Sequence, residues 1–358
     1  MAKATLVSLA NSLGVSRQTI SNAINAPERV KPATLARVRR AIDEAGYRPS
    51  AAARQLRTRR SMNLGIRMIP GADGINGSIY DRFLHSLAEA AQERGYRLTL
   101  FYAASDTDEI EQYGQLLDVA DLDGFVLTGT HRDDERTAWL LEHGVPFATF
   151  GRPWSDDEDP FASAHAWVDV DGGAGTEEAT RALMAQGHRS IGFLGWPAGS
   201  GVGDDRRAGW RRALAHGPLA DGASRAAAAG LDIETEDGVT RGADGAARLA
   251  GAGATAIVCA SDSLALGALA ALRSRPAGAP PPAVVGFDDT PVAAAIGLSS
   301  VAQPIESVAR QIIAVLTHGL AGKGGGTTPE PPRHVLLPAA FVERTPHALG
   351  TTPAAPSP

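Results

Sequence analysis

The feature that most constrains the fold is a pair of short helical patterns near the start of the chain, separated by one glycine. Apolar residues recur from Leu6 to Leu13 at the spacing of a single helix face. Gly14 suits the left-handed conformation that ends a helix, and Ser16 is a favourable N-cap for a second helix over residues 17–25. The spacing therefore predicts two helices joined by a tight turn.

A third helical pattern follows over residues 32–46, with Pro32 in its first turn and Gly46 at its end. Two helices joined by a short turn and covered by a third are typical of a helix-turn-helix module. We therefore expect an all-α helix-turn-helix DNA-binding domain over residues 1–48.

The charge distribution indicates DNA as the partner of this module. Residues 1–60 contain 12 Lys and Arg against 3 Asp and Glu, although the whole chain has a net charge of −6. A basic segment of this kind can neutralise DNA phosphates. The alternative is a basic three-helix module that binds a protein or no macromolecule. This alternative does not explain why several residue types that can hydrogen-bond bases share one helix face.

The second helix has two contrasting faces. Ile20, Ala23 and Ile24 form the inward, apolar face. We predict that the opposite face enters a major groove, because its residue types can hydrogen-bond base edges. That face carries Arg17, Gln18, Ser21, Asn22 and Asn25.

The segment from Thr5 to Ser61 resembles the lactose-repressor (LacI/GalR) family of transcriptional regulators along its whole length. The resemblance rests on "GVSRQTIS", "GYRPS", "AARQLR" and an N-x-P-x-x-V pattern. It implies a homodimer or a higher oligomer that reads a pseudo-palindromic double-stranded DNA operator. The DNA-binding residues expected on both grounds are Thr5, Ser16, Arg17, Gln18, Thr19, Ser21, Asn22, Asn25, Arg29, Tyr47, Ala53 and Leu56.

Residues 49–60 match the hinge of that family, which becomes helical on DNA. The resemblance implies that Leu56 wedges between base pairs in the minor groove and that the small Ala53 lets two hinges approach closely. A plain Ala/Arg linker is the alternative. The position of Asn22 is commonly Arg in the family, and Asn suits adenine where Arg suits guanine. We therefore expect the centre of the operator to differ from the centre that is usual in the family.

From Leu64 onward, strand patterns alternate with amphipathic helix patterns, and the series restarts near residues 156–164. This alternation predicts α/β lobes built on parallel, doubly wound sheets. The resemblance implies a two-lobed, periplasmic-binding-protein-like core that dimerises and holds a small-molecule effector between its lobes. We expect this core over residues 61–345, before a disordered tail over 346–358. The expected first lobe is about 61–157 plus 299–322, and the second about 163–295 plus 333–345.

Ligands of open α/β sheets bind beyond the carboxyl ends of the strands, where polar and aromatic side chains fix them. The resemblance adds Arg206, Ser261 and Asp288, which match positions that contact the effector in the family. A sugar is the expected effector, and a nucleoside or other polar metabolite acting as a co-repressor is the alternative. The predicted effector-binding residues are Tyr80, Arg152, Trp196, Arg206, Ser261, Asp262 and Asp288.

Three of these assignments have a structural alternative. Asp262 would then only cap its helix, and Trp196 would belong to the core. Arg206 would pair with Asp204 or Asp205 on the surface.

Other function classes find little support. The glycine-rich "GWPAGSGVGDD" lacks the third glycine of a dinucleotide loop, and we predict no enzyme, no cofactor and no metal. The single Cys259 excludes intrachain disulfides, and no segment approaches the ~20 apolar residues of a membrane helix. We expect a cytoplasmic transcriptional repressor, because a secreted solute-binding protein requires an export signal in place of the basic head.

Overall fold

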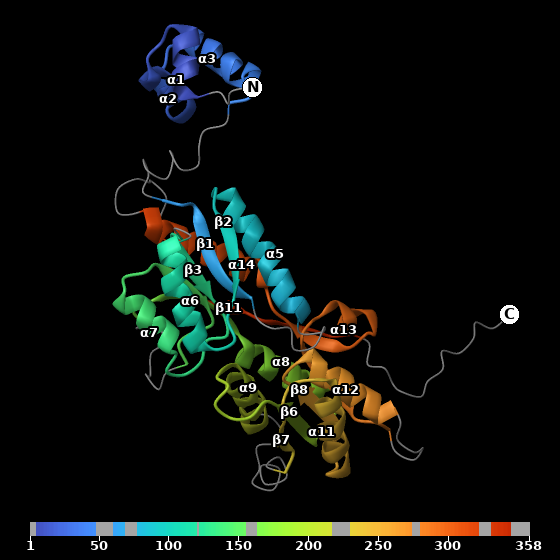
Figure 1. Ribbon diagram of the computed structural model, residues 1–358. Coiled ribbons are helices and arrows are strands. Elements are labelled where there is room, and N and C mark those ends of the chain that lie inside the picture. Colours follow the sequence, from blue (N-terminus) through green and yellow to red (C-terminus); the bar gives the residue numbers. More distant parts are fainter. Residues whose placement is uncertain are drawn as a thin grey trace, which may run out of the picture. The chain divides into compact units, whose positions relative to one another are not determined.

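The computed structural model forms two compact units, Met1–Ser61 and Met62–Pro358 (Figure 1). The predicted hinge residues Ala53 and Leu56 lie outside the described residues. The structure describes residues 5–47, 60–68, 77–119, 122–154, 163–216, 230–273, 280–321 and 331–344.

The first unit is helical where it is described, and local signals set its helix ends. Gly14 has a φ of 64°, which places it in the left-handed region where it ends the first helix. The Ser16 hydroxyl accepts a hydrogen bond from the Thr19 amide at 3.0 Å and caps the second. The elements are α1 (Leu6–Leu13), α2 (Arg17–Asn25), a 3-10 turn (Pro27–Arg29) and α3 (Pro32–Glu44).

Each helix of this unit contributes to one small core. Ala10 comes from α1, Ile20 and Ala23 come from α2, and Val38 comes from α3. Ile20 and Val38 are completely buried. The predicted inward face of the second helix is therefore confirmed, and its opposite face is left free of the core.

The second unit contains two six-stranded sheets. The first has the order β11-β5-β4-β3-β1-β2, and all of its pairs are parallel. Its strands are β1 (Asn63–Met68), β2 (Arg97–Tyr102), β3 (Gly124–Leu127), β4 (Phe147–Phe150), β5 (Ala166–Asp171) and β11 (His334–Pro338). The first lobe consists of this sheet with α5 (Gly77–Glu93), α6 (Asp106–Val119), α7 (Glu135–Glu142) and α14 (Ile305–Ala321).

The second sheet repeats this order as β12-β10-β9-β8-β6-β7, but β12 runs antiparallel to β10. Its strands are β6 (Ile191–Gly195), β7 (Asp232–Glu234), β8 (Ala256–Cys259), β9 (Ala283–Asp288), β10 (Ser299–Ala302) and β12 (Ala340–Val342). The second lobe adds the helices α8 (Gly172–Ala185), α9 (Val202–His216), α11 (Val239–Gly251), α12 (Asp262–Arg273) and α13 (Pro291–Ala295).

The chain crosses between the lobes at different places from those expected. β5 pairs with β4, so the second lobe does not begin at residue 163. β10 pairs with β9 in the second sheet, and only α14 carries the chain back to the first lobe. β11 then pairs with β5, and β12 alone returns to the second sheet. Residue patterns identify a strand but not its partner, which explains the misplaced boundaries.

Helices cover both faces of the first sheet (Figure 1). The neighbouring residues Phe125 and Val126 of β3 belong to different apolar clusters, because successive strand residues point to opposite faces. One cluster packs under α5 and α14, and the other packs under α6 and α7. This leaves the carboxyl ends of the strands as the open edge of the lobe.

The second lobe packs around Trp210, which stacks on Phe193 with 5.7 Å between ring centroids. Trp210 is 2% exposed. Cys259 is buried in the same cluster, and burial raises the pKa of its thiol. Among the helices that the structure describes, none has the length and apolar character needed to cross a membrane.

Candidate functional site

The first candidate site is the outer face of α2 in the helical unit. The side chains of Arg17 and Gln18 are exposed, whereas Ser21 and Asn22 are half-buried. The Gln18 amide Nε2 donates to Asn22 Oδ1 at 2.9 Å. This bond orients both amides as one hydrogen-bonding unit on the helix surface, which is the chemistry that reads adenine edges. The side chain of Asn25 lies outside the described part of the chain.

The remaining predicted DNA contacts of this unit have other structural tasks as well. The Thr5 hydroxyl accepts from the Ser8 amide at 3.1 Å and caps α1, as Ser16 caps α2 at Thr19. The first turn of α2 contains no acidic residue, so its free amides favour a phosphate. Arg29 is exposed and Tyr47 is half-buried.

The second candidate site is a cavity of about 330 Å³ in the α/β unit, lined from both lobes. The first lobe contributes Tyr80, from α5, and the turn after β3. The second contributes Trp196 after β6, Arg206 from α9 and Asp288 at the end of β9. The cavity therefore lies beyond the carboxyl ends of the strands, where open α/β sheets bind ligands.

Arg206 is the central polar group of this cavity. Its guanidinium carbon lies 3.6 Å from the Phe287 ring centroid and 5.1 Å from that of Trp196. It donates one hydrogen bond, from Nη1 to the Ala260 carbonyl, and its buried Nε has no partner among the described residues. Nη2 lies 3.8 Å from Asp288 Oδ1. Burial lowers the pKa of Arg206.

The surface alternative for Arg206 is wrong. The side chain is 6% exposed and its acidic neighbour is Asp288. Asp204 instead lies 3.5 Å from Arg207. Asp205 accepts from the Gly173 amide at 2.7 Å.

Asp288 is held in an unusual state. Burial raises the pKa of its carboxyl to about 7, although the Arg206 guanidinium opposes the shift. The Gln303 amide donates to Asp288 Oδ1 at 2.7 Å. The backbone of Asp288 has a φ of 107°, a region that non-glycine residues rarely adopt. Strain of this kind clusters at functional sites, because the surrounding structure has to hold it in place.

Arg152 lies behind the cavity surface. Its Nε donates to Asp169 Oδ2 at 2.6 Å, and its Nη2 donates to Asp205 Oδ2 at 3.2 Å. Both carboxylates line the cavity. Arg152 also lies over the ring of Trp154, 4.6 Å from its centroid, and Trp154 lines the cavity too. The arginine therefore positions the lining groups without lining the cavity itself.

Ser261 and Asp262 are also set back from the cavity. The Ser261 hydroxyl donates to Asp237 at 2.5 Å and accepts from the Leu264 amide at 3.2 Å. Asp262 is completely buried and accepts from the amide and hydroxyl of Thr290 and from the Ser300 hydroxyl at 2.7–2.8 Å. It therefore connects α12 to two neighbouring segments. Asp237, which lines the cavity, stands where Ser261 was expected.

Several lining residues were not predicted from the sequence. Trp154, Asp169, Asp237 and Gln303 occupy strand ends or connections. The indole nitrogens of Trp154 and Trp196 are buried without a hydrogen-bond partner in the described structure. A signal for Asp169 existed, because a charged residue inside the apolar strand "AWVDVD" requires a specific partner.

Comparison with known proteins relates both units of the chain to known families. Residues 5–50 match the lacI family of bacterial regulatory proteins, and residues 180–345 match a periplasmic binding protein-like domain. The chain is 33% identical over 338 residues to the HTH-type transcriptional regulator CelR of Thermobifida fusca, covering 93% of this chain and 95% of CelR. A regulator from Mycolicibacterium smegmatis is 31% identical over 348 residues, covering 90% and 92%.

Solved structures give the same result. A LacI-family regulatory protein from Chloroflexus aggregans superposes with a TM-score of 0.68 at 32% identity, covering 79% of this chain and 97% of its own. The CelR–cellobiose complex has a TM-score of 0.66 at 29% identity, covering 95% and 99%. The lac repressor dimer bound to operator has a TM-score of 0.73 at 22% identity and shares the fold, covering 96% and 98%.

The relatives that match along nearly the whole chain are transcriptional regulators and not enzymes, in agreement with the predicted absence of catalysis. The helix-turn-helix unit, the two-lobed core and the extent of these matches together lead to one conclusion. The chain belongs to the lacI family of bacterial regulatory proteins and is a DNA-binding transcriptional regulator.

Proposed function

We propose that this protein is a repressor whose affinity for a pseudo-palindromic operator is controlled by a sugar bound in the cavity between the lobes. One observation carries the effector part: Arg206 Nε and Trp196 Nε1 are buried at the cavity without a partner among the described residues. An unmet buried donor costs about 1–3 kcal/mol. A ligand oxygen that accepts from these groups recovers that cost.

The lining favours a sugar because it combines polar groups with aromatic faces. Trp154, Trp196 and Tyr80 offer rings to the apolar face of a pyranose, while Arg206 and Asp288 can bind its hydroxyl groups. The relative CelR has been solved as a complex with cellobiose. Cellobiose is therefore the first effector to test.

The homodimer proposal rests on the exposed edge of the first lobe. β2 is an edge strand, and Leu100 and Tyr102 on it are 49% and 62% exposed. A groove beside them is lined by residues of α5 and β2, among them Leu84 and Leu98 together with Gln92 and Arg97. An exposed apolar edge of this kind favours pairing with a second copy.

The operator is tested at α2. Asn22→Ala removes one amide of the Gln18–Asn22 unit. We expect a loss of base preference at one position of each half-site of about 1–3 kcal/mol, measured by site selection on random duplexes. Asn11→Ala on the exposed face of α1 is the matched control. An unaltered selection profile for Asn22→Ala would remove Asn22 from the readout.

The effector is tested with the full-length protein on its selected operator duplex. Fluorescence anisotropy with and without cellobiose, other disaccharides and nucleosides measures the change in operator affinity. Repression with induction requires that a sugar lowers this affinity, because an effector acts only by binding two conformations unequally. A ligand that raises the affinity is a co-repressor and contradicts the proposed sign. Binding by nucleosides alone contradicts the sugar.

A further inference from the structure

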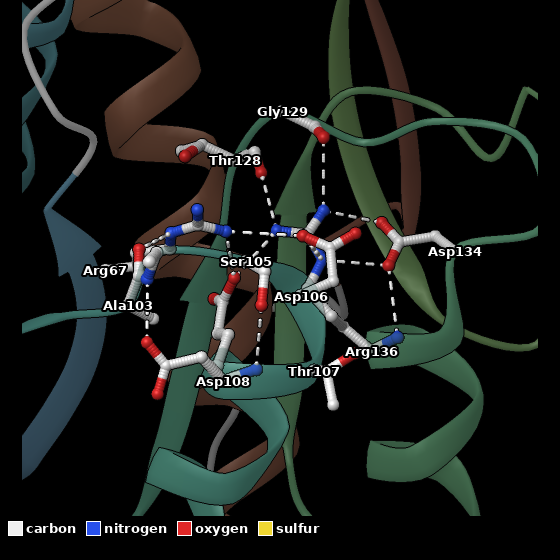
Figure 2. A network of polar contacts seen from close by, with 12 residues as sticks. Arg67, Ala103, Ser105, Asp106, Thr107, Asp108, Thr128, Gly129, Asp134 and Arg136 are labelled. Carbon is white, nitrogen blue, oxygen red and sulfur yellow. Dashed lines mark hydrogen bonds and ion pairs between the residues drawn. The ribbon is translucent and has the colours of Figure 1, made fainter.

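A buried ion-pair network lies behind the first-lobe wall of the cavity (Figure 2). Glu109 of α6, which is 1% exposed, is its centre. Its Oε2 accepts from Arg67 Nη1 at 2.8 Å and from Arg136 Nη1 at 2.9 Å. Its Oε1 accepts from the Tyr113 hydroxyl at 2.6 Å. One carboxylate therefore joins two arginines that come from β1 and α7.

One arm of the network reaches the turn after β3. Arg136 donates from Nη1 to the Thr128 carbonyl at 3.2 Å and from Nη2 to the Gly129 carbonyl at 3.1 Å (Figure 2). Thr128 and Gly129 line the cavity, and Arg136 does not. Gly129 has a φ of 63°, so this turn depends on a conformation that glycine adopts at little cost. The arginine fixes the turn from behind.

The other arm reaches Tyr80. Arg67 is held by its bond to Glu109 and by donation from Nε to the Ala103 carbonyl at 3.0 Å. The backbone carbonyl of Arg67 accepts from the Tyr80 hydroxyl. Tyr80 lines the cavity from α5. The two segments of the first-lobe wall are therefore connected through Glu109. Asp106 Oδ1 adds longer contacts, at 3.3 Å from Arg67 Nη1 and 3.6 Å from Arg136 Nε.

We propose that Glu109 is a positioning residue for effector binding, which holds Tyr80 through Arg67 and the Thr128–Gly129 turn through Arg136. The inference rests on the proposed function of the cavity. A carboxylate has two acceptor oxygens, which two guanidinium groups and a hydroxyl can share. A glutamine has one acceptor oxygen and turns an amide donor toward other donors. The two segments of the wall then keep only the longer contacts through Asp106.

The test compares Glu109→Gln with Glu111→Gln, an exposed glutamate on the same helix. Both are made in the full-length protein. Hydrogen–deuterium exchange of residues 124–130 without ligand, the cellobiose Kd and the operator Kd without sugar are measured. For Glu109→Gln we expect exchange and cellobiose Kd each to increase about tenfold, because hydrogen bonds to charged groups are lost. The operator Kd stays unchanged, and Glu111→Gln changes none of the three.

Unchanged exchange, or faster exchange with an unchanged cellobiose Kd, would overturn the positioning role. A wild-type protein that binds no sugar contradicts the proposed effector, and the exchange measurement then decides separately whether Glu109 holds the wall. If Glu109→Gln does not fold, Tyr113→Phe removes a single hydroxyl from the same carboxylate and retains the ring in its apolar cluster. The cellobiose Kd should then rise about threefold. A wild-type Kd and wild-type exchange in that variant would also reject the inference.

Discussion

The two lobes each bury an arginine beside the cavity, and the two arginines are in opposite states. Arg136 in the first lobe uses all five of its side-chain N–H groups, on Asp134, on Glu109 and on two backbone carbonyls. Arg206 in the second lobe donates one hydrogen bond and leaves its Nε without a partner among the described residues. The first lobe therefore supplies a wall whose arginine is fully paired, and the second supplies a buried donor that is available to the proposed effector.

The difference follows from the neighbours of each arginine. Arg136 lies in the first turn of α7, two residues after Asp134. The Asp134 carboxylate accepts from the Arg136 backbone amide and caps the helix. Arg206 faces the rings of Trp196 and Phe287, which attract a cation but accept no conventional hydrogen bond. An arginine among carboxylates stabilises the fold, whereas an arginine among rings remains available to a ligand.

The largest expected effect is a difference in the free energy of unfolding between variants of the two arginines. Arg136→Met leaves Asp134 buried without its arginine partner and removes one of the two arginines bonded to Glu109, so we expect the free energy of unfolding to fall by about 3–5 kcal/mol. Arg206→Met removes an incompletely paired charge and should cost far less. Urea unfolding of both variants measures the contrast. Equal losses would end the distinction between a structural and an available arginine.

The next effect separates them by ligand binding. Arg206→Met removes the charged donors of the cavity, so we expect the binding free energy of the effector to weaken by about 1.5–3 kcal/mol. This raises the effector Kd roughly tenfold to a hundredfold. The operator Kd without effector should not change. Arg248→Met, an exposed arginine of α11, is the matched control. Calorimetric titration with cellobiose gives the answer, and wild-type affinity in Arg206→Met contradicts a ligand role for this side chain.

A third effect comes from pH. Below about pH 7 the Asp288 carboxyl is protonated, because burial raises its pKa to about 7, and above that pH it is ionised. Ionised Asp288 accepts from ligand hydroxyls, so binding releases a proton and effector affinity should rise between pH 6 and pH 8. The change is at most about tenfold per pH unit. Asp288→Asn should give a flat profile, and a steep profile in that variant would assign the dependence to another group.

The same raised pKa affects stability in the opposite direction. The neutral Asp288 carboxyl contributes to folding most fully below its ordinary value of 3.8, and that contribution is lost as pH rises through about 7.

The smallest expected effect lies at the exposed end of the first-lobe network. His131 Nε2 lies 2.5 Å from Asp106 Oδ2, and its side chain is 41% exposed. Partial burial lowers the pKa of His131, but hydrogen bonds with the Arg132 carbonyl and with Asp106 raise it above its usual value. We expect His131→Gln to cost less than about 1 kcal/mol, because exposed ion pairs contribute little.

The direction of the His131 effect is also fixed. A raised pKa gives stability that is present below the unfolded-state pKa and is lost as pH rises through the folded-state pKa. Urea midpoints at pH 6 and pH 9 should therefore differ more for the wild type than for His131→Gln. His216→Gln on α9 serves as control. An equal difference in all three proteins would remove His131 from the network's pH response.

The accuracy of the sequence interpretation depends on how local each feature is. Gly14 and Ser16 act within one turn, so the helices of the head were predicted closely. β5 pairs with the preceding strand β4 and with β11, which follows far later in the sequence. The residue pattern shows neither pairing, so the lobe boundaries were misplaced. Short-range patterns report conformation and not pairing.

The cavity follows the same rule. Arg206 and Asp288 were predicted from a family resemblance, and both line the cavity. Their shifted pKa values come from burial by residues distant in the sequence, which the local pattern does not show. Asp262 had the residue type of a ligand contact and serves α12, α13 and β10 instead. Trp154 was missed because it follows β4 in a segment without a periodic pattern.

The three crossings between the sheets restrict how the lobes can move. The chain passes from β5 to α8, from β10 to α14 and from β11 to β12 within a few residues each time. Because all three connections are short, we expect the lobes to rotate against each other and not to separate. Gln303 lies in the connection between β10 and α14, and its amide donates a hydrogen bond to the Asp288 carboxylate. A ligand that binds Asp288 would therefore act directly on one of the connections about which the lobes rotate.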